Sequence, residues 1–222
     1  MPAKKVAMIP ARLGSQRLKK KNLQPFAGMT LIEYAIVRCK ESGVFDEIYV
    51  NSESELFAEY ANRAGVKFYK RPEELGNNVS TSEEFVEDFL NQIHCQDLFQ
   101  IHSITPLLTP VEIRDFVTFC SDNRQFDTVL SCIEDQIEVS FEGKPINFSL
   151  EQKTNSQDLT PTQRVTWSAT KWSREVYLEA KSHGKIGTYS GNVGFYSVGP
   201  FSGLAIKTAD DLKIATALKD AL

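Results

Sequence analysis

The stretch KKVAMIPARLGSQRLKKKN, residues 4–22, decides the fold because it joins a short apolar run to a long basic loop. The apolar run ends at Pro10, the pattern expected of a buried strand whose loop begins at once. The loop contains no acidic residue, and its cations are Arg12, Arg17, Lys19, Lys20 and Lys21. Since the whole chain carries a net charge of -4, this positive charge is local and indicates a small anionic partner rather than a nucleic acid.

The composition is that of an ordinary soluble globular protein, because 41% hydrophobic and 24% charged residues argue against a disordered or fibrous chain. We predict a single domain over residues 1–222. The four cysteines form no CxxC pair, which argues against a thiolate zinc site and favours free thiols in a reducing compartment. The apolar run before Pro10 is too short for a signal-peptide core or a membrane span, so we expect a cytoplasmic protein without a membrane partner.

Beyond the basic loop, helical and extended patterns alternate. Capping boxes at Thr30 and Thr81 start two helices, and Gly43 and Gly65 end two. We predict strands over 4–9, 47–51, 66–70, 97–103 and 126–132, and helices over 30–42, 53–64, 82–93 and 109–122. This order predicts an α/β, Rossmann-like sheet with helices on both faces. In such sheets ligands bind at the carboxyl ends of the strands, where the basic loop begins.

The pattern changes from residue 133 onward. Polar sequence with a hairpin or turn at EGKPINF predicts an inserted arm or lid around 133–167, or a plain surface insertion. Regular patterns return as a helix over 168–184, a strand over 192–198 and a closing helix capped by Thr208. We expect Trp167 and Trp172 to pack in the arm or core, and TWSATKW is alternatively a dimer surface.

Gly14 and Ser15 lie in the loop after the first strand, where backbone N–H groups can converge on an oxyanion. Arg12 and Lys21 add fixed charge suited to a triphosphate. The spacing matches neither a P-loop nor a dinucleotide fingerprint, so the residue pattern alone leaves two readings open. The loop either binds phosphate or is a solvated basic surface.

The loop resembles a family signature. IPARLGSQRLKKKN is similar to the N-terminal signature of the acylneuraminate cytidylyltransferases, roughly IPARxGSxxxxxKN, whose shorter form IPAR also occurs in the Kdo cytidylyltransferases. The resemblance continues in order along the chain. Its further segments are KRPEEL at 70–75, STSEEFVEDFL at 80–90, IHSITPLLT at 101–109, NVGFY at 192–196 and IKTADDLKIA at 206–215.

The resemblance implies a Rossmann-like nucleotidyltransferase sheet with a small arm that forms a homodimer. It implies that the anomeric hydroxyl of a 2-keto acid sugar, sialic-acid-like or Kdo-like, attacks the α-phosphate of CTP and that pyrophosphate leaves with the help of Mg²⁺. Such phosphoryl transfer depends on positioning and charge stabilisation rather than on a protein nucleophile.

Residue roles follow from the matched positions. The resemblance makes Arg12 and Lys21 the catalytic cations that neutralise the triphosphate and the departing pyrophosphate. It places nucleotide contacts at Ala11, Gly14, Ser15, Asn22, Arg71 and Ser82. We expect substrate contacts from His102, Thr105, Arg164, Asn192, Tyr196 and Lys207.

The chain departs from the family at its last motif. Ala205 and Lys207 stand where the family has metal-binding aspartates, and a lysine cannot bind Mg²⁺, which requires oxygen ligands. Asp210 and Asp211 remain candidate metal ligands, although acids in a first helical turn are also explained by the helix dipole. Lys207 is a candidate to hold the sugar carboxylate or a phosphate in place of the metal.

Other departures lie on the sugar side. His102 replaces a glutamine of the family and Leu108 replaces an arginine, so the sugar carboxylate needs another partner. Candidates for this role are Arg164, Lys171 and Lys207. The leading interpretation is an active cytidylyltransferase. The alternatives are a catalytically silent homologue that binds nucleotide or sugar nucleotide, and a nucleotidyltransferase that uses another NTP or a phosphorylated sugar.

Overall fold

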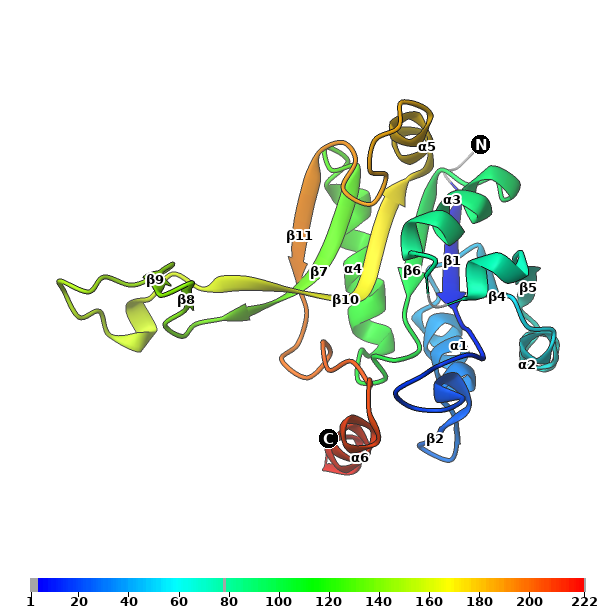
Figure 1. Cartoon of the computed structure of the whole chain (residues 1–222), viewed down its shortest axis with the longest axis horizontal. Coiled ribbons are helices and arrows are strands. Elements are labelled where there is room, and N and C mark those ends of the chain that lie inside the picture. Colours follow the sequence, from blue (N-terminus) through cyan, green and yellow to red (C-terminus); the bar gives the residue numbers. More distant parts are fainter. Residues whose placement is uncertain (1–3, 78, 222) are drawn as a thin grey trace.

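A computed structural model gives the structure of residues 4–77 and 79–221. Its centre is a seven-stranded sheet in the order β11-β7-β10-β6-β1-β4-β5 (Figure 1). The strands are β1 Lys5–Pro10, β4 Glu47–Ser52, β5 Lys67–Lys70, β6 Asp97–Ile101, β7 Thr128–Asp135, β10 Thr162–Ser173 and β11 Val193–Ser197. Only β10 runs antiparallel to its neighbours, so the sheet is mixed rather than fully parallel.

Helices cover both faces of the sheet, as predicted. Side chains of α1, α2 and α4 pack in one core with Ile9 and Val50, and side chains of α3 and α5 pack in a second core with Val6 and Met8. A third cluster joins α6 to α1 and to the short hairpin of β2 and β3. The bounds are β2 Pro25–Phe26, β3 Met29–Thr30, α1 Leu31–Ser42, α2 Leu56–Ala64, α3 Ser82–Gln92, α4 Pro110–Asp122, α5 Arg174–Ser182 and α6 Ala209–Ala221.

Local signals place the helix ends. The predicted capping boxes at Thr30 and Thr81 are confirmed, and Thr208 caps α6 through its hydroxyl, which accepts from the Asp211 N–H at 3.2 Å. Gly43 and Gly65 end α1 and α2 in the left-handed conformation, with φ values of 69° and 67°. These caps need only residues close in the sequence, which is why the sequence predicted them.

The helix predicted over 168–184 is wrong in its first third. Residues 168–173 belong to β10, and α5 begins only at Arg174. This part of β10 is buried between β6 and β7, where Lys171 forms an ion pair with Asp97 at 3.2 Å. Pairing with two strands that are distant in the sequence decides the conformation here. Lys171 is polar although it is buried, so the pattern of apolar residues does not indicate a buried strand.

An arm leaves the body between β7 and β10 (Figure 1). It carries the hairpin of β8 (Ser140–Phe141) and β9 (Lys144–Pro145) and a short 3-10 helix, η3 (Ser156–Asp158). The hairpin predicted at EGKPINF is therefore present, with its turn at Glu142 and Gly143. At the base of the arm the register of β10 shifts between Val165 and Thr170.

All four cysteines are free, as predicted, and all four are buried. Within residues 4–77 and 79–221, no helix combines the length and the apolar character needed to cross a membrane.

Arg38 of α1 fixes the turn that follows β6. Its side chain is fully buried, and its Nη1 donates to the carbonyls of Thr105 at 2.8 Å and Leu108 at 2.6 Å. Its Nη2 donates to the carbonyl of His102 at 3.3 Å. One guanidinium therefore satisfies three carbonyls of a buried turn at the carboxyl end of β6.

We expect Arg38→Met to lower the free energy of unfolding by about 3 kcal/mol, because it removes three hydrogen bonds from the carbonyl groups of a buried turn. The matched control is Arg63→Met, which removes an exposed ion pair with Glu33 and should cost less than about 1 kcal/mol. Urea unfolding of both variants measures the difference. Equal effects of the two substitutions would contradict the assigned role of Arg38.

Candidate functional site

Two adjoining cavities open at the carboxyl ends of β1 and β6. The first has a volume of about 150 Å³ and the second about 410 Å³. The loop after β1 lines the first with Pro10, Ala11, Arg12, Ser15, Lys21 and Asn22. Its other wall consists of Arg71, Phe85, His102 and Ile104. His102 and Ile104 also line the second cavity, so the two cavities adjoin at these side chains, and together they are called the cleft.

The second cavity lies between the turn after β6, the bulged part of β10 and the segment before α6. Its further lining residues are Thr105, Arg164, Val165, Thr166, Trp167, Gly203, Ala205 and Lys207. The N–H of Ile206 donates to the carbonyl of Ile104 at 2.7 Å and thereby fastens the segment before α6 to the turn. Three segments distant in sequence thus meet around one cavity.

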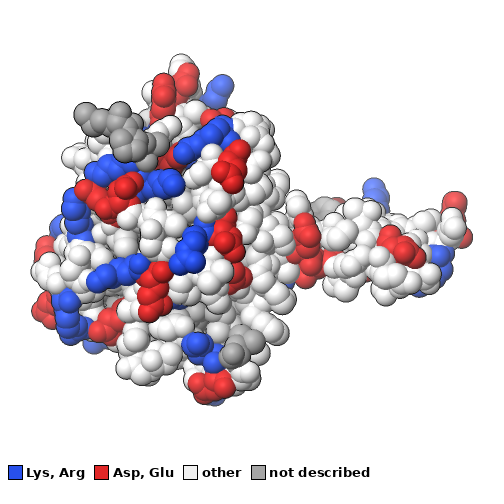
Figure 2. All heavy atoms as spheres, turned by 180° about the vertical axis from the view of Figure 1, so that it is seen from behind, with Lys and Arg blue, Asp and Glu red and all other residues white. Residues whose placement is uncertain are grey.

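Positive charge dominates the cleft. Its lining includes Arg12, Lys21, Arg71, Arg164 and Lys207, and no Asp or Glu of residues 4–77 and 79–221 lines either cavity. On the face shown in Figure 2 the charges are mixed, with basic and acidic side chains interspersed. A cleft with cations alone on its walls favours an anion with several negative charges.

Lys21 is a cation of the cleft whose surroundings disfavour its charged form. It begins the short 3-10 helix η1, Lys21–Leu23, and its pKa lies below the ordinary lysine value. Burial is the largest cause, followed by repulsion from Arg17, Arg12 and Lys207, while Asp211 opposes the shift. The free protein therefore holds like charges together at a cost that a bound anion would remove.

The loop from Ala11 to Asn22 is fastened to the sheet. The Asn22 side-chain amide donates to the carbonyl of Arg12 at 3.0 Å, and its Oδ1 accepts from the Ser103 hydroxyl at 2.7 Å. The N–H of Leu13 donates to Glu53 Oε1 at 2.9 Å. Asn22 thus holds the loop, and the nucleotide contact that the resemblance implies for it stays a prediction.

Arg71 and Phe85 form the wall opposite the loop. Arg71 is 2% exposed, pairs with Glu53 at 2.9 Å and donates to the carbonyl of Ala11 at 3.0 Å. Its guanidinium lies 4.8 Å from the centre of the Phe85 ring. The sequence analysis missed Phe85, which lies one helical turn after Ser82, and that spacing is the signal that could have found it.

Two buried polar atoms of the first cavity have no hydrogen-bond partner within the described residues. They are the Ser15 hydroxyl oxygen and Nε of Arg71. Orphaned buried donors are uncommon in folded proteins and indicate a ligand or water that completes them. Both belong to residues that the resemblance assigns to nucleotide binding.

The predicted metal ligands lie at the start of α6, outside the lining of both cavities. Asp211 Oδ2 accepts from the N–H groups of Lys207 at 2.9 Å and Thr208 at 2.8 Å, which lowers the pKa of this carboxyl. Asp210 pairs with Lys213 at 3.1 Å, and both side chains are exposed. In residues 4–77 and 79–221, no group of three or more His, Cys, Asp or Glu is placed to hold a metal. The residues present therefore do not fit a Mg²⁺ ion held by protein carboxylates.

Several predicted residues do not join the lining. Gly14 and Ser82 are exposed, at the edge of the first cavity's loop and at the start of α3. Asn192 lies at the amino ends of the parallel strands, away from the cleft at their carboxyl ends, because β11 begins beside Thr128, the first residue of β7. Tyr196 packs against Phe116 and Phe119, with ring centroids 5.6 and 5.1 Å apart. Lys171 is occupied by Asp97.

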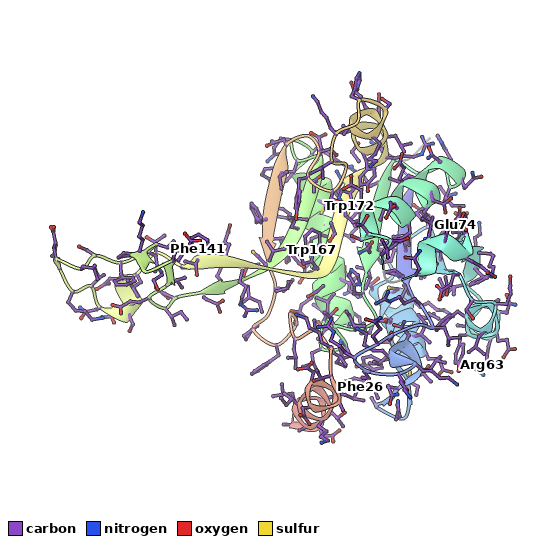
Figure 3. All side chains as sticks on the ribbon, in the orientation of Figure 1. Phe26, Arg63, Glu74, Phe141, Trp167 and Trp172 are labelled. Atoms are coloured by element: carbon purple, nitrogen blue, oxygen red, sulfur yellow. The ribbon has the colours of Figure 1, made fainter. Side chains whose placement is uncertain are left out.

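Trp167 is a lining residue whose role the sequence analysis did not predict. It lies in the bulge of β10 with a φ of 60°, which is strained for a tryptophan, and its ring centroid is 6.0 Å from that of Tyr189. Figure 3 shows it at the base of the arm, where β10 bends. Strained residues cluster at functional sites, which fits its place on the wall of the second cavity.

Comparison with known proteins assigns this cleft to a family. A family model described as cytidylyltransferase matches residues 6–201. The chain belongs to the cytidylyltransferase family. It is 29% identical over 218 residues to the N-acylneuraminate cytidylyltransferase of Streptococcus agalactiae. The aligned region covers 94% of this chain but only 51% of that protein. The chain thus spans about half the length of such relatives.

A second relative is covered more fully. The pseudaminic acid cytidylyltransferase of Campylobacter jejuni is 29% identical over 169 residues, which are 71% of this chain and 73% of that protein. Together with the streptococcal relative, it confirms that the chain resembles the acylneuraminate type of cytidylyltransferase.

Solved structures confirm the fold. A CMP:2-keto-3-deoxy-manno-octonic acid synthetase, complexed with CTP, matches with a TM-score of 0.71 and 16% identity over 99% of both chains. The 4-diphosphocytidyl-2C-methyl-D-erythritol synthase of Anaerococcus prevotii matches with a TM-score of 0.66 and 12% identity over 98% of this chain and 99% of that chain. At these identities the likeness concerns the nucleotidyltransferase fold alone.

We expect Lys21→Met to unfold at the same or a higher urea concentration than the wild type at pH 7. Because the pKa of Lys21 is lowered, the folded chain binds this proton less tightly than the unfolded chain, so the charge costs stability while both states are protonated. The advantage of the variant should shrink as the pH rises toward 10.5, the ordinary lysine value. Lys19→Met, in the exposed part of the loop, should change nothing. A clear loss of stability in Lys21→Met would contradict this account.

Proposed function

We propose that the protein transfers CMP from CTP to the anomeric hydroxyl of an acidic 2-keto sugar and releases pyrophosphate. The observation that carries the proposal is the pair of adjoining cavities lined by five cations and, among the described residues, no carboxylate. Both proposed substrates are anions, and the two cavities offer each of them its own positive wall. Family membership supports the same reaction class.

In this proposal the first cavity holds the nucleotide. Lys21 and Arg12 face the triphosphate, and the Ser15 hydroxyl donates to a phosphate oxygen and so gains the partner it lacks. The Phe85 ring and the Arg71 guanidinium offer flat surfaces for the base or ribose. The cations stabilise the charge that develops on the departing pyrophosphate, and this is where most of the catalysis arises.

The second cavity holds the sugar. Arg164 and Lys207 line it, and either offers the cation that a sugar carboxylate needs. Arg164 is fixed by Asp135, which accepts from its Nε at 2.8 Å and leaves the other guanidinium nitrogens available. Thr105 contributes the floor, and its hydroxyl is held by the carbonyl of His102 at 3.1 Å. The names of the streptococcal and Campylobacter relatives favour a nine-carbon, sialic-acid-like sugar.

A catalytically silent nucleotide binder is the second candidate. The observation that favours it is Lys207, which lies on the cavity wall where the family's metal-binding aspartates are expected. Such a protein would bind CTP or a CMP-sugar through the same cations but would release no pyrophosphate. Binding and turnover therefore have to be measured separately.

A nucleotide screen followed by a turnover assay tests the proposal. We expect CTP to raise the unfolding temperature more than UTP, ATP or GTP does, because the nucleotide binds only the folded chain. With CTP and a panel of 2-keto acid sugars, we then expect pyrophosphate release with at least one nonulosonic acid. Stabilisation by CTP without turnover on any sugar would favour the silent binder, and no stabilisation by CTP would contradict both candidates.

Lys207 is tested by charge reversal. We expect Lys207→Asp to abolish turnover, because it places a negative charge in a cavity that has to accept an anion. Lys207→Arg should retain activity, and Lys213→Asp, on the exposed surface of α6, serves as the control for helix charge. Unchanged or improved turnover in Lys207→Asp would overturn the proposed role and would favour a metal ligand at this position.

We further propose that the arm forms a homodimer. Ile137, Phe141, Ile146 and Leu150 expose most of their apolar surface, and Figure 3 shows Phe141 on the arm. A groove of about 760 Å³ lies at the base of the arm, with Val139 and Ile146 in its wall. Exposed apolar patches of this kind mark protein interfaces.

We expect the double variant Phe141→Asp, Ile146→Asp to elute as a monomer, while the wild type has twice the monomer mass in light scattering. Val111→Asp is the matched control, since it removes an equally exposed apolar side chain from α4. A monomeric wild type at micromolar concentration would contradict the proposed dimer.

We also propose that the protein works in the cytoplasm. Its four buried cysteines are all free, which fits a reducing compartment. Burial raises the pKa of Cys39, Cys95 and Cys120 to about 12, so these thiols are unreactive.

A further inference from the structure

The two cavities meet at His102 and Ile104, which line both, and His102 is the titratable side chain of the two. His102 directly follows β6, and its backbone is held on both sides. Its N–H donates to the carbonyl of Ser168 at 3.2 Å, and its carbonyl accepts from Arg38 at 3.3 Å and from Thr105 at 3.1 Å. The imidazole is therefore fixed between the proposed nucleotide and the proposed sugar.

Gln100 orients the ring. The side-chain nitrogen of Gln100 lies 2.5 Å from Nε2 of His102, and its Oε1 is buried without a partner. The two ends of a glutamine amide have the same shape, so a half-turn of the amide puts Oε1 against the ring, where a ring N–H can donate to it, and moves the amide nitrogen to the position that Oε1 held. In that arrangement Nε2–H donates to Gln100, and the lone pair of Nδ1 is left without a partner among the described residues.

The surroundings keep the ring neutral in the free protein. Burial and then the nearby Lys21 lower the pKa of His102 to about 4. Three further cations lie around His102. Arg38 of α1 donates to its carbonyl, and Arg164 of β10 and Lys207 before α6 line the second cavity together with it. At neutral pH the cleft thus contains one neutral proton acceptor among cations.

We propose that His102 is the general base of the transfer, with Gln100 as its positioning residue; this rests on the proposed function. Nδ1 takes the proton of the anomeric hydroxyl as the hydroxyl oxygen bonds to the α-phosphorus of CTP. The bond between that phosphorus and the oxygen bridging to the β-phosphate breaks, and pyrophosphate leaves with its electron pair. The imidazolium then returns the proton to solvent.

Binding of CTP prepares the base. The triphosphate neutralises Lys21 and brings negative charge beside the ring, so the pKa of His102 rises toward the range in which an imidazole accepts protons well. The base becomes effective only when the nucleotide is in place. Nucleotide binding in the first cavity therefore controls the basicity of a side chain that also lines the second cavity.

NMR of isotopically labelled histidine tests the state of the ring without turnover. The chain has only three histidines, so the resonances are few. In the free protein we expect a neutral His102 with the proton on Nε2, and on addition of CTP a rise in its pKa of about one unit or more. A ring that carries its proton on Nδ1 in the CTP complex would overturn the proposal. Gln100→Leu should abolish the tautomer preference.

The pH dependence of turnover tests the role itself. We expect kcat of the wild type to rise with pH through one ionisation, and His102→Gln to lower kcat by about 10²-fold and to flatten this rise. The KM for CTP should change little, and added imidazole should restore activity to His102→Ala. His94→Gln, at an exposed position, is the matched control.

The possible failures are distinct. A wild type that binds no CTP or turns over no sugar contradicts the proposed function. An active wild type whose His102→Gln variant keeps the same rise of kcat with pH contradicts the base alone. A purely structural role would change stability and the KM for CTP in His102→Gln but not the shape of the pH profile.

Discussion

The antiparallel pairing of β10 with β6 and β7 is the constraint on which the rest of the structure depends. The twelve residues of this strand cross the sheet between two parallel neighbours. Its first half carries Arg164, Thr166 and Trp167 to the side of His102, so the second cavity exists because this strand is inserted there. The same half extends into the arm. The position of the proposed sugar site and the position of the arm thus have one cause.

The pairing of β10 buries a charged side chain within the sheet and places other charged side chains in the cleft. Lys171 is buried in β10, and Asp97 of β6 neutralises it inside the sheet. Two cations of the cleft also have carboxylate partners, since Arg71 pairs with Glu53 at 2.9 Å and Arg164 with Asp135 at 2.8 Å. Lys21 differs, because burial and then repulsion from Arg17, Arg12 and Lys207 lower its pKa. The fold therefore concentrates its unbalanced charge around Lys21. Unbalanced charge in a cleft is a requirement of anion binding, and a triphosphate would relieve it.

Sequence reasoning succeeded where structure depends on near neighbours. The loop after β1, the capping box at Thr30 and the glycine ends of α1 and α2 follow from residues within one turn of each other. It failed for residues 168–173, because their extended conformation depends on partners 68 to 76 residues away in β6 and 40 to 44 residues away in β7. Motif likeness also grouped Asn192 and Tyr196 with the site, whereas the parallel register of β11 places Asn192 at the amino ends of the parallel strands, away from the cleft. Phe85 and Trp167 were missed because an aromatic residue in a helix or strand is expected to pack in the hydrophobic core.

The central claim is that this cationic cleft holds a nucleoside triphosphate beside an acidic sugar, and a crystal structure of the chain with CTP tests it most directly. The account predicts phosphate oxygens within hydrogen-bond distance of Lys21 and the Ser15 hydroxyl, the cytidine against Phe85 or Arg71, and the α-phosphate facing His102. A nucleotide bound elsewhere on the protein, or one whose α-phosphate points away from the second cavity, would contradict it.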